Sequence, residues 1–223
     1  MNYSAEVILL VMVKYGLLIV DMINLFLSSD TPWNNDNAQI RGRVVINPIA
    51  RLADALRKKK LPVIYVNHGL RRVADGYDDG MVFERLEHIG KTRGYPKLPL
   101  TRETKDMFLS GTKWTQTIDE LKPHVSDYIV LKNRNSGFYG GDLETLLTQL
   151  KVDTLIITGV STNLCIRATC FDAFQKGWKT IIPRECVESY SDRAQEQGLE
   201  DLAFTTSYVI SVEETLTLVQ NSN

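Results

Sequence analysis

The chain has 223 residues, a length that suits one α/β domain with a single core. Hydrophobic residues make up 43% and charged residues 24%, and the formal net charge of -1 gives no electrostatic reason to expect nucleic-acid binding. The 3 cysteines are an odd number without paired spacing, which argues against a disulfide framework and favours a reducing, cytoplasmic compartment.

The first apolar run covers residues 7–20. Lys14 and Gly16 interrupt it and Asp21 ends it, so the run is too short for a membrane span. No basic segment precedes it, which argues against a signal peptide. We interpret residues 17–21 as the first buried strand and residues 1–13 as an N-terminal extension of unassigned role.

Short apolar runs then alternate with amphipathic stretches. We expect further strands at residues 62–66, 128–131, 155–158, 179–182 and 207–210, and helices at residues 38–58, 142–150, 166–176, 191–203 and 212–219. Pro48 is expected to kink the first helix or to break it in two. Because the strands are apolar on both faces and alternate with helices, they predict a three-layer α-β-α sandwich around a six-stranded, mostly parallel sheet.

One segment interrupts this alternation of strands and helices. Residues 68–111 are rich in glycine, proline and charge, and they are too many for a plain connection. We expect them to form a lid or an interface arm. Since no linker or repeat divides the rest of the chain, residues 1–223 are expected to form a single domain.

Three reactive side chains lie at or just past the carboxyl ends of predicted strands: Asp21, Lys132 and Cys165. Ligand sites of parallel sheets lie at this edge. Cys165 follows a turn of glycine and hydroxyl residues and begins a helix, where free N–H groups and the helix dipole favour a thiolate nucleophile. Taken singly, each residue could instead be structural: a core cysteine, a capping aspartate or a solvated lysine.

Three segments resemble the isochorismatase-like cysteine hydrolases, which have this fold. They are residues 18–26, 130–138 and 159–174, within a resemblance that covers about residues 16–215. Residues 110–123 look most similar to the ureidoacrylate and biuret amidohydrolases of that family. The resemblance implies that Asp21, Lys132 and Cys165 form a catalytic triad, and that the protein is a homodimer or homotetramer.

The resemblance also implies a cis peptide bond between Val160 and Ser161 and an oxyanion hole formed by the backbone N–H groups of Ser161 and Cys165. Nicotinamidases of the family carry an Asp-x-His metal motif, whereas the corresponding strand end here reads Val-Asn-His-Gly over residues 66–69. His68 and the other histidines are scattered, so we expect no metal and no other cofactor. Where many relatives have glutamine, this chain has Ile23.

The function that the resemblance implies is hydrolysis of a C–N bond in a small amide, carbamoyl or ureido compound through an acyl-enzyme. The alternatives are nicotinamidase-type or isochorismate hydrolysis, and a non-catalytic binding protein on the same fold. The only partner that we expect, besides a second copy of the chain, is a small-molecule substrate, with no nucleic acid and no membrane. Candidates for contacting that substrate are two arginines that could meet a carboxylate, an amide and three aromatic residues: Arg72, Arg134, Asn163, Phe26, Trp114 and Phe138.

Overall fold

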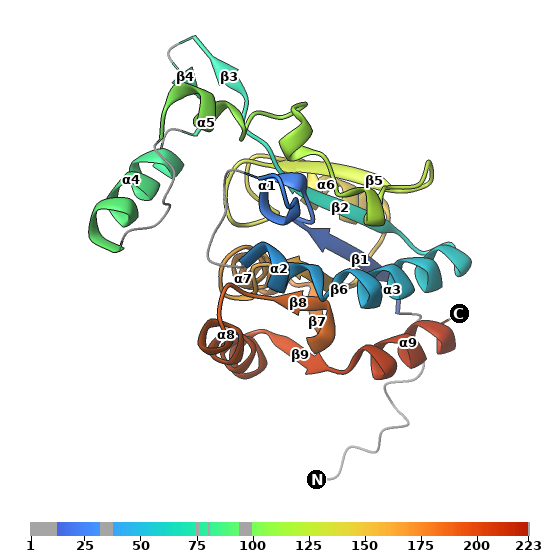
Figure 1. The fold of residues 1–223 in the computed structure, drawn as a ribbon. Coiled ribbons are helices and arrows are strands. Elements are labelled where there is room, and N and C mark those ends of the chain that lie inside the picture. Colours follow the sequence, from blue (N-terminus) through green and yellow to red (C-terminus); the bar gives the residue numbers. More distant parts are fainter. Residues whose placement is uncertain (1–12, 32–37, 75, 80, 94–99, 223) are drawn as a thin grey trace.

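A central parallel sheet organises the protein. The computed structural model describes residues 13–31, 38–74, 76–79, 81–93 and 100–222, so nearly all of the expected N-terminal extension lies outside the described residues. All neighbouring strands on the main path of the sheet are parallel (Figure 1). Their order is β5 (Tyr128–Lys132), β2 (Val63–His68), β1 (Tyr15–Val20), β6 (Thr154–Val160), β7 (Lys179–Pro183) and β9 (Ser207–Ile210). A short β8 (Val187–Glu188) pairs with the end of β6. The predicted six-stranded α/β sandwich is confirmed.

Side chains of β1 alternate between the two layers of helices. Leu17 and Ile19 point into a core shared with α3 (Ile46–Lys58) and α9 (Val212–Asn221). Leu18 and Val20 point into the opposite core, shared with α6 (Leu143–Gln149), α7 (Arg167–Gln175) and α8 (Asp192–Thr205). Each of these side chains contributes roughly 1.5–3 kcal/mol by being fully buried, which holds β1 at the centre of the sheet.

Local sequence signals explain where several helices begin. The side chain of Ser191 accepts a hydrogen bond from the Ala194 N–H at the start of α8. Ser211 and Glu214 form a capping box at the start of α9. Such caps satisfy backbone donors that have no partner within the helix, and each contributes about 1 kcal/mol.

The predicted helix over residues 38–58 is two helices, α2 (Ala38–Arg43) and α3. The break lies at residues 44 and 45, and residue 44 carries the carbonyl to which a helical N–H at residue 48 would donate. The expectation that Pro48 breaks the predicted helix in two is therefore confirmed. Pro48 is the third residue of α3. Because backbone N–H groups in the first turn have no acceptor within the helix, proline costs little there.

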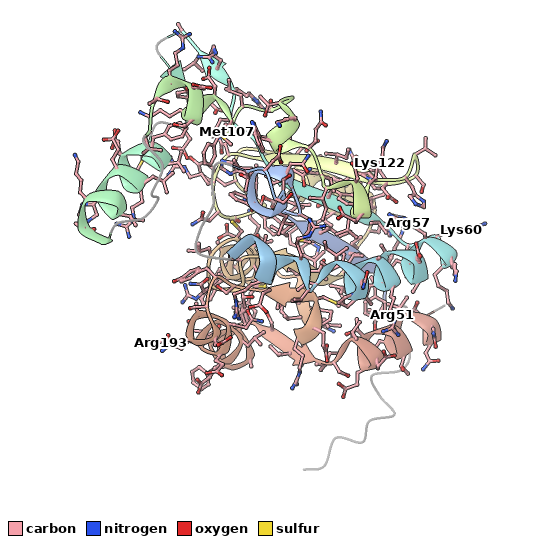
Figure 2. All side chains as sticks on the ribbon, in the orientation of Figure 1. Arg51, Arg57, Lys60, Met107, Lys122 and Arg193 are labelled. Atoms are coloured by element: carbon pink, nitrogen blue, oxygen red, sulfur yellow. The ribbon has the colours of Figure 1, made fainter. Side chains whose placement is uncertain are left out.

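The insertion at residues 68–111, called the arm below, contains elements that the sequence analysis did not assign. They are a hairpin of β3 (Arg72–Val73) and β4 (Gly76–Tyr77), α4 (Met81–Arg93) and α5 (Arg102–Asp106), which together project from the sandwich in Figure 1. Buried apolar residues Leu70, Phe83 and Phe108 of the arm pack with Ile23, next to the end of β1 and short helix α1 (Asn24–Leu27). Met107 belongs to the same cluster, at the base of the arm in Figure 2.

The backbone conformation at position 159, near the end of β6, requires glycine. Its φ is +112°, and a Cβ atom there would lie 2.0 Å from the carbonyl oxygen of Val20 in β1. We therefore expect Gly159→Ala to lower the free energy of unfolding by roughly 3 kcal/mol or more, because backbone atoms of two central strands would have to separate. Urea unfolding measures this.

The matched control is Gly177→Ala. Gly177 also has a positive φ, +90°, but a Cβ atom there would have no atom within 4 Å. Gly177→Ala should lower the free energy of unfolding by only about 1–2 kcal/mol, the cost of placing a residue with a Cβ atom in a left-handed conformation. Equal losses in the two variants would contradict the steric account of Gly159.

Candidate active site

The three residues singled out at strand ends meet at one point in the structure. Asp21 directly follows β1, Lys132 is the last residue of β5, and Cys165 lies in the π-helical turn η4 (Thr162–Ile166) after β6. The Lys132 Nζ atom lies 2.8 Å from Asp21 Oδ2 and 3.5 Å from Cys165 Sγ. Since β2 separates β5 from β1 in the sheet, the Lys132 side chain has to cross the end of β2 to make these contacts.

Lys132 is a fully buried cation. Its relative exposure is 0%, and Nζ also donates a hydrogen bond of 2.9 Å to the carbonyl oxygen of Arg134. Burial by itself lowers the pKa of Lys132, but the Asp21 carboxylate opposes that effect and the pKa ends above its usual value. The ammonium therefore stays charged at neutral pH and holds the other two groups in place.

The Asp21 carboxylate is held in a fixed orientation. Asp21 has a φ of 55°, a left-handed conformation that aspartate tolerates better than most residues. Its backbone N–H donates to the Val66 carbonyl, and its Oδ1 accepts a 2.8 Å hydrogen bond from the His68 N–H. Oδ2 is thereby directed at Lys132.

The thiol of Cys165 is protonated in the resting protein. Burial, followed by the Asp21 charge, raises the pKa of Cys165 to about 12, although the Lys132 charge acts in the opposite direction. The expectation that the helix position favours a thiolate is wrong for this state, because desolvation outweighs the nearby positive charge. Nucleophilic attack therefore needs a group that removes the thiol proton as the sulfur reacts.

The turn before Cys165 contains a cis peptide bond between Val160 and Ser161. The backbone N–H groups of Leu164 and Ile166 both donate to the Ser161 carbonyl oxygen, closing a tight turn. The Thr169 hydroxyl donates to the Cys165 carbonyl oxygen at 2.7 Å and accepts from the Gly137 N–H at 2.9 Å. Thr169, to which the sequence analysis gave no role, thus joins the cysteine turn to the loop after Lys132. The oxyanion role of Ser161 and Cys165 stays a prediction.

Two of the six substrate candidates lie together. Phe26 and Trp114 are half-buried and pack on the cluster formed by Ile23, Phe108 and other apolar residues beside Asp21. Asn163 is held by Tyr190 and Ser189, with the Ser189 hydroxyl 2.7 Å from its Oδ1 atom.

Phe138 packs against a second aromatic ring. Its ring packs against Trp178, with ring centroids 5.4 Å apart. The indole N–H of Trp178 donates to the Val152 carbonyl oxygen, just before β6 begins, whereas Cys165 follows the end of that strand. Phe138 and Cys165 are both half-buried side chains packed on the same core cluster, and the pocket role of Phe138 stays a prediction.

The two candidate arginines are already paired. The Arg72 Nη2 atom lies 2.6 Å from Oδ1 of Asp106, and both residues belong to the arm. The Arg134 Nε atom lies 2.8 Å from Oδ2 of Asp79, a buried carboxylate of the arm. Each guanidinium therefore has a carboxylate neighbour, and contact of either arginine with a substrate stays a prediction.

Arg134 therefore has two contacts of different kinds. Its side chain holds the arm through Asp79, while its carbonyl oxygen accepts from Lys132 Nζ. The adjacent Asn133 strengthens the same junction, because its amide donates to Asp78 at 3.2 Å. Sequence reasoning missed Asp78 and Asp79, which no local pattern links to the loop after β5.

No group of three His, Cys, Asp or Glu side chains that could hold a metal ion occurs in the described part of the chain. None of the helices among the described residues combines the length and apolar character that crossing a bilayer requires.

Comparisons with known proteins all point to the same family. The Isochorismatase domain model matches residues 15–214. The chain is 30% identical over 200 residues to the isochorismatase family protein YaaI of Bacillus subtilis, covering 89% of this chain and 94% of that protein. It is 29% identical over 170 residues to N-carbamoylsarcosine amidase of Arthrobacter, covering 75% of this chain but 57% of that enzyme. The crystal structure of a cysteine hydrolase from Pseudomonas syringae has the same fold, with a TM-score of 0.78, 23% identity and 94% of each chain covered.

Proposed function

Because the chain belongs to the isochorismatase family, we propose that it is a cysteine-dependent amidohydrolase that cleaves a C–N bond in a small amide, carbamoyl or ureido compound. The observation that carries this proposal is the contact of Lys132 Nζ with both Asp21 and Cys165, at 2.8 and 3.5 Å, in a buried position at the carboxyl edge of the sheet. A nucleophile, a proton acceptor and a cation are the groups that acyl transfer from an amide requires.

In the first half of the reaction, Cys165 Sγ attacks the substrate carbonyl carbon while the thiol proton moves to the Asp21 carboxylate. The carbonyl oxygen becomes an oxyanion, which the N–H groups of Ser161 and Cys165 would stabilise. Such donors typically contribute about 3 kcal/mol. The C–N bond then breaks as Asp21 returns the proton to the leaving nitrogen, and a thioester remains on the sulfur.

In the second half, water attacks the thioester carbonyl and gives a proton to Asp21. The C–S bond breaks, the acid product leaves, and the proton on Asp21 returns to the sulfur. Lys132 keeps its charge throughout. Its role is to orient the Asp21 carboxylate and to stabilise negative charge on sulfur while the proton is absent.

Names of relatives support this substrate class. N-carbamoylsarcosine amidase and the ureidoacrylate amidohydrolase RutB of Pseudomonas savastanoi both carry amide-hydrolase names. We further propose a single hydrolase domain that acts in the cytoplasm as a homodimer or homotetramer with the arm as a lid or interface. The three free thiols support a reducing compartment.

The experiment that tests the function is ammonia release from a substrate panel. The panel contains primary amides, ureas, N-carbamoyl amino acids, nicotinamide and isochorismate, each assayed with and without a chelator. Isochorismate contains no nitrogen, so its hydrolysis is followed by pyruvate release instead. Turnover of an amide or urea that the chelator leaves unchanged is expected. Turnover of isochorismate alone, or turnover that the chelator abolishes, would instead favour one of the other reactions of the family.

A further inference from the structure

His68 lies beside the triad, yet the mechanism above does not use its side chain. It is the last residue of β2 and pairs in register with Lys132 of β5. In a parallel sheet, paired residues point to the same face, so the imidazole stands next to the Lys132 side chain where that chain crosses the end of β2. The His68 backbone N–H already holds Asp21. Its ring is therefore placed at the edge of the reacting groups.

The imidazole also faces the arm. Its ring meets the ring of Phe108 edge-on, with centroids 5.6 Å apart and planes at 87°. Phe108 belongs to the apolar cluster that includes Ile23, with Phe26 and Trp114 packed on it. His68 thus lies between the triad and the apolar surface that is the candidate wall for a substrate.

One nitrogen of this ring has no partner. His68 is 6% exposed, and among the described residues its Nε2 atom is buried without a hydrogen bond. A buried polar atom left without a hydrogen bond costs roughly 1–3 kcal/mol. Leucine or phenylalanine would fill the same apolar space at no such cost, so a purely structural role does not account for an imidazole here.

We infer that His68 is a substrate-binding residue whose imidazole forms a hydrogen bond with a polar group in the non-reacting part of the substrate. This inference rests on the proposed amide hydrolysis. It narrows the substrate class to small amides or ureas that carry a second polar group near the scissile carbonyl.

The imidazole does this as a neutral group. Burial, followed by the nearby Lys132 charge, lowers the pKa of His68 to about 4. A neutral ring has one donor and one acceptor nitrogen, so it can bind an N–H or an oxygen without bringing a second positive charge close to Lys132. Loss of a hydrogen bond to a buried partner discriminates strongly between substrates, more than loss of a methylene group does.

The test uses four compounds of similar size. Pentanamide has no second polar group, propylurea adds an N–H beside the carbonyl, succinamate adds a carboxylate, and N-carbamoylglycine has both. The variants are His68→Leu, which removes the ring nitrogens, and His68→Gln, whose terminal amide can replace Nε2. Both keep the backbone N–H that holds Asp21. The measurement is kcat/KM from ammonia release.

We expect the unaltered protein to prefer at least one polar compound over pentanamide. His68→Leu should lower kcat/KM for that compound by about 10- to 100-fold, the range that corresponds to losing one buried hydrogen bond, and should change the value for pentanamide less than about threefold. His68→Gln should recover part of the preference. Equal loss for all four compounds, or no loss for any, would overturn the inference.

Two controls separate this result from other failures. The rate of Cys165 alkylation by iodoacetamide should stay within about twofold in both His68 variants, since their neutral side chains leave the charges of the triad intact. A large change would assign His68 to the triad instead of the substrate. Binding of the four compounds to Cys165→Ala and to the Cys165→Ala, His68→Leu double variant, measured by calorimetry, tests the inference without turnover.

If the compounds bind but none is hydrolysed, the proposed function fails. The inference about His68 is then decided by whether His68→Leu weakens binding of the polar compounds selectively. If none of the four compounds binds, the inference itself is overturned.

Discussion

Replacing Cys165 with alanine is expected to lower kcat by at least about 10⁴-fold, because no acyl-enzyme can form without the sulfur. The fold should remain intact, since the half-buried side chain loses a single atom and the Lys132–Asp21 pair does not depend on it. Urea unfolding should therefore shift by less than about 1.5 kcal/mol. Ammonia release from the best compound of the panel measures the loss of activity.

Cys170→Ala is the matched control. Cys170 lies on α7, is fully buried, and belongs to the core cluster that the sheet shares with α6, α7 and α8. Its removal should cost about 1–2 kcal/mol of stability from the cavity that remains, yet leave kcat within about threefold. Activity above a tenth of the unaltered value in Cys165→Ala would show that the sulfur is not the nucleophile.

Breaking the buried ion pair should have the second-largest effect. In Lys132→Met the Asp21 carboxylate stays buried, with 0% exposure, and loses its counter-charge. Removing one partner of such a pair typically costs about 3–5 kcal/mol of stability, and we expect kcat to fall by at least about 10³-fold as well. Urea unfolding and ammonia release measure the two losses.

The double variant Asp21→Asn, Lys132→Met should recover most of the lost stability without recovering activity, because neither charge is then buried alone. The surface pair of Arg167 and Asp201, 3.0 Å apart with side chains 43% and 54% exposed, is the control. Arg167→Met should cost less than about 1 kcal/mol. A double variant as unstable as Lys132→Met would contradict the ion-pair account.

Asp21→Asn and Lys132→Met should change the reactivity of the Cys165 thiol in opposite directions. Asp21 raises the pKa of Cys165 and Lys132 lowers it, with burial as the largest cause of the elevated value. Asp21→Asn should therefore speed alkylation of Cys165 at pH 7 although it abolishes turnover, whereas Lys132→Met should slow alkylation. Slower alkylation in both variants would mean that Asp21 acts on the thiol mainly as a base and not through its charge.

The strands and the three reactive residues could be predicted from sequence because each depends on a local signal. Apolar runs identify the buried strands, and Asp21, Lys132 and Cys165 stand at the ends of three of them. Parallel topology then brings all carboxyl ends to one edge, whatever the order of the strands. The distance of 2.8 Å between Lys132 and Asp21 could not be predicted, since it depends on how far one side chain reaches across β2.

The surroundings of the substrate candidates could not be predicted from sequence, because they depend on partners that are distant in the chain. Arg134 reads as an available cation in sequence, but its partner Asp79 lies in the arm. Phe138 follows a strand end and packs against Trp178, which is 40 residues further along the chain. The state of the Cys165 thiol was mistaken for the same reason, since desolvation by tertiary packing has no local sequence signal.

The double contact of Arg134 links the position of the arm to that of the Lys132 ammonium, which in turn contacts Cys165. One residue fastens the arm by its guanidinium and the ammonium of Lys132 by its carbonyl oxygen. Because one residue makes both contacts, a displacement of the arm is expected to move the ammonium as well. With the arm as the lid proposed above, we expect compounds too large for it to bind weakly and also to react slowly, since the cation beside the sulfur would be displaced.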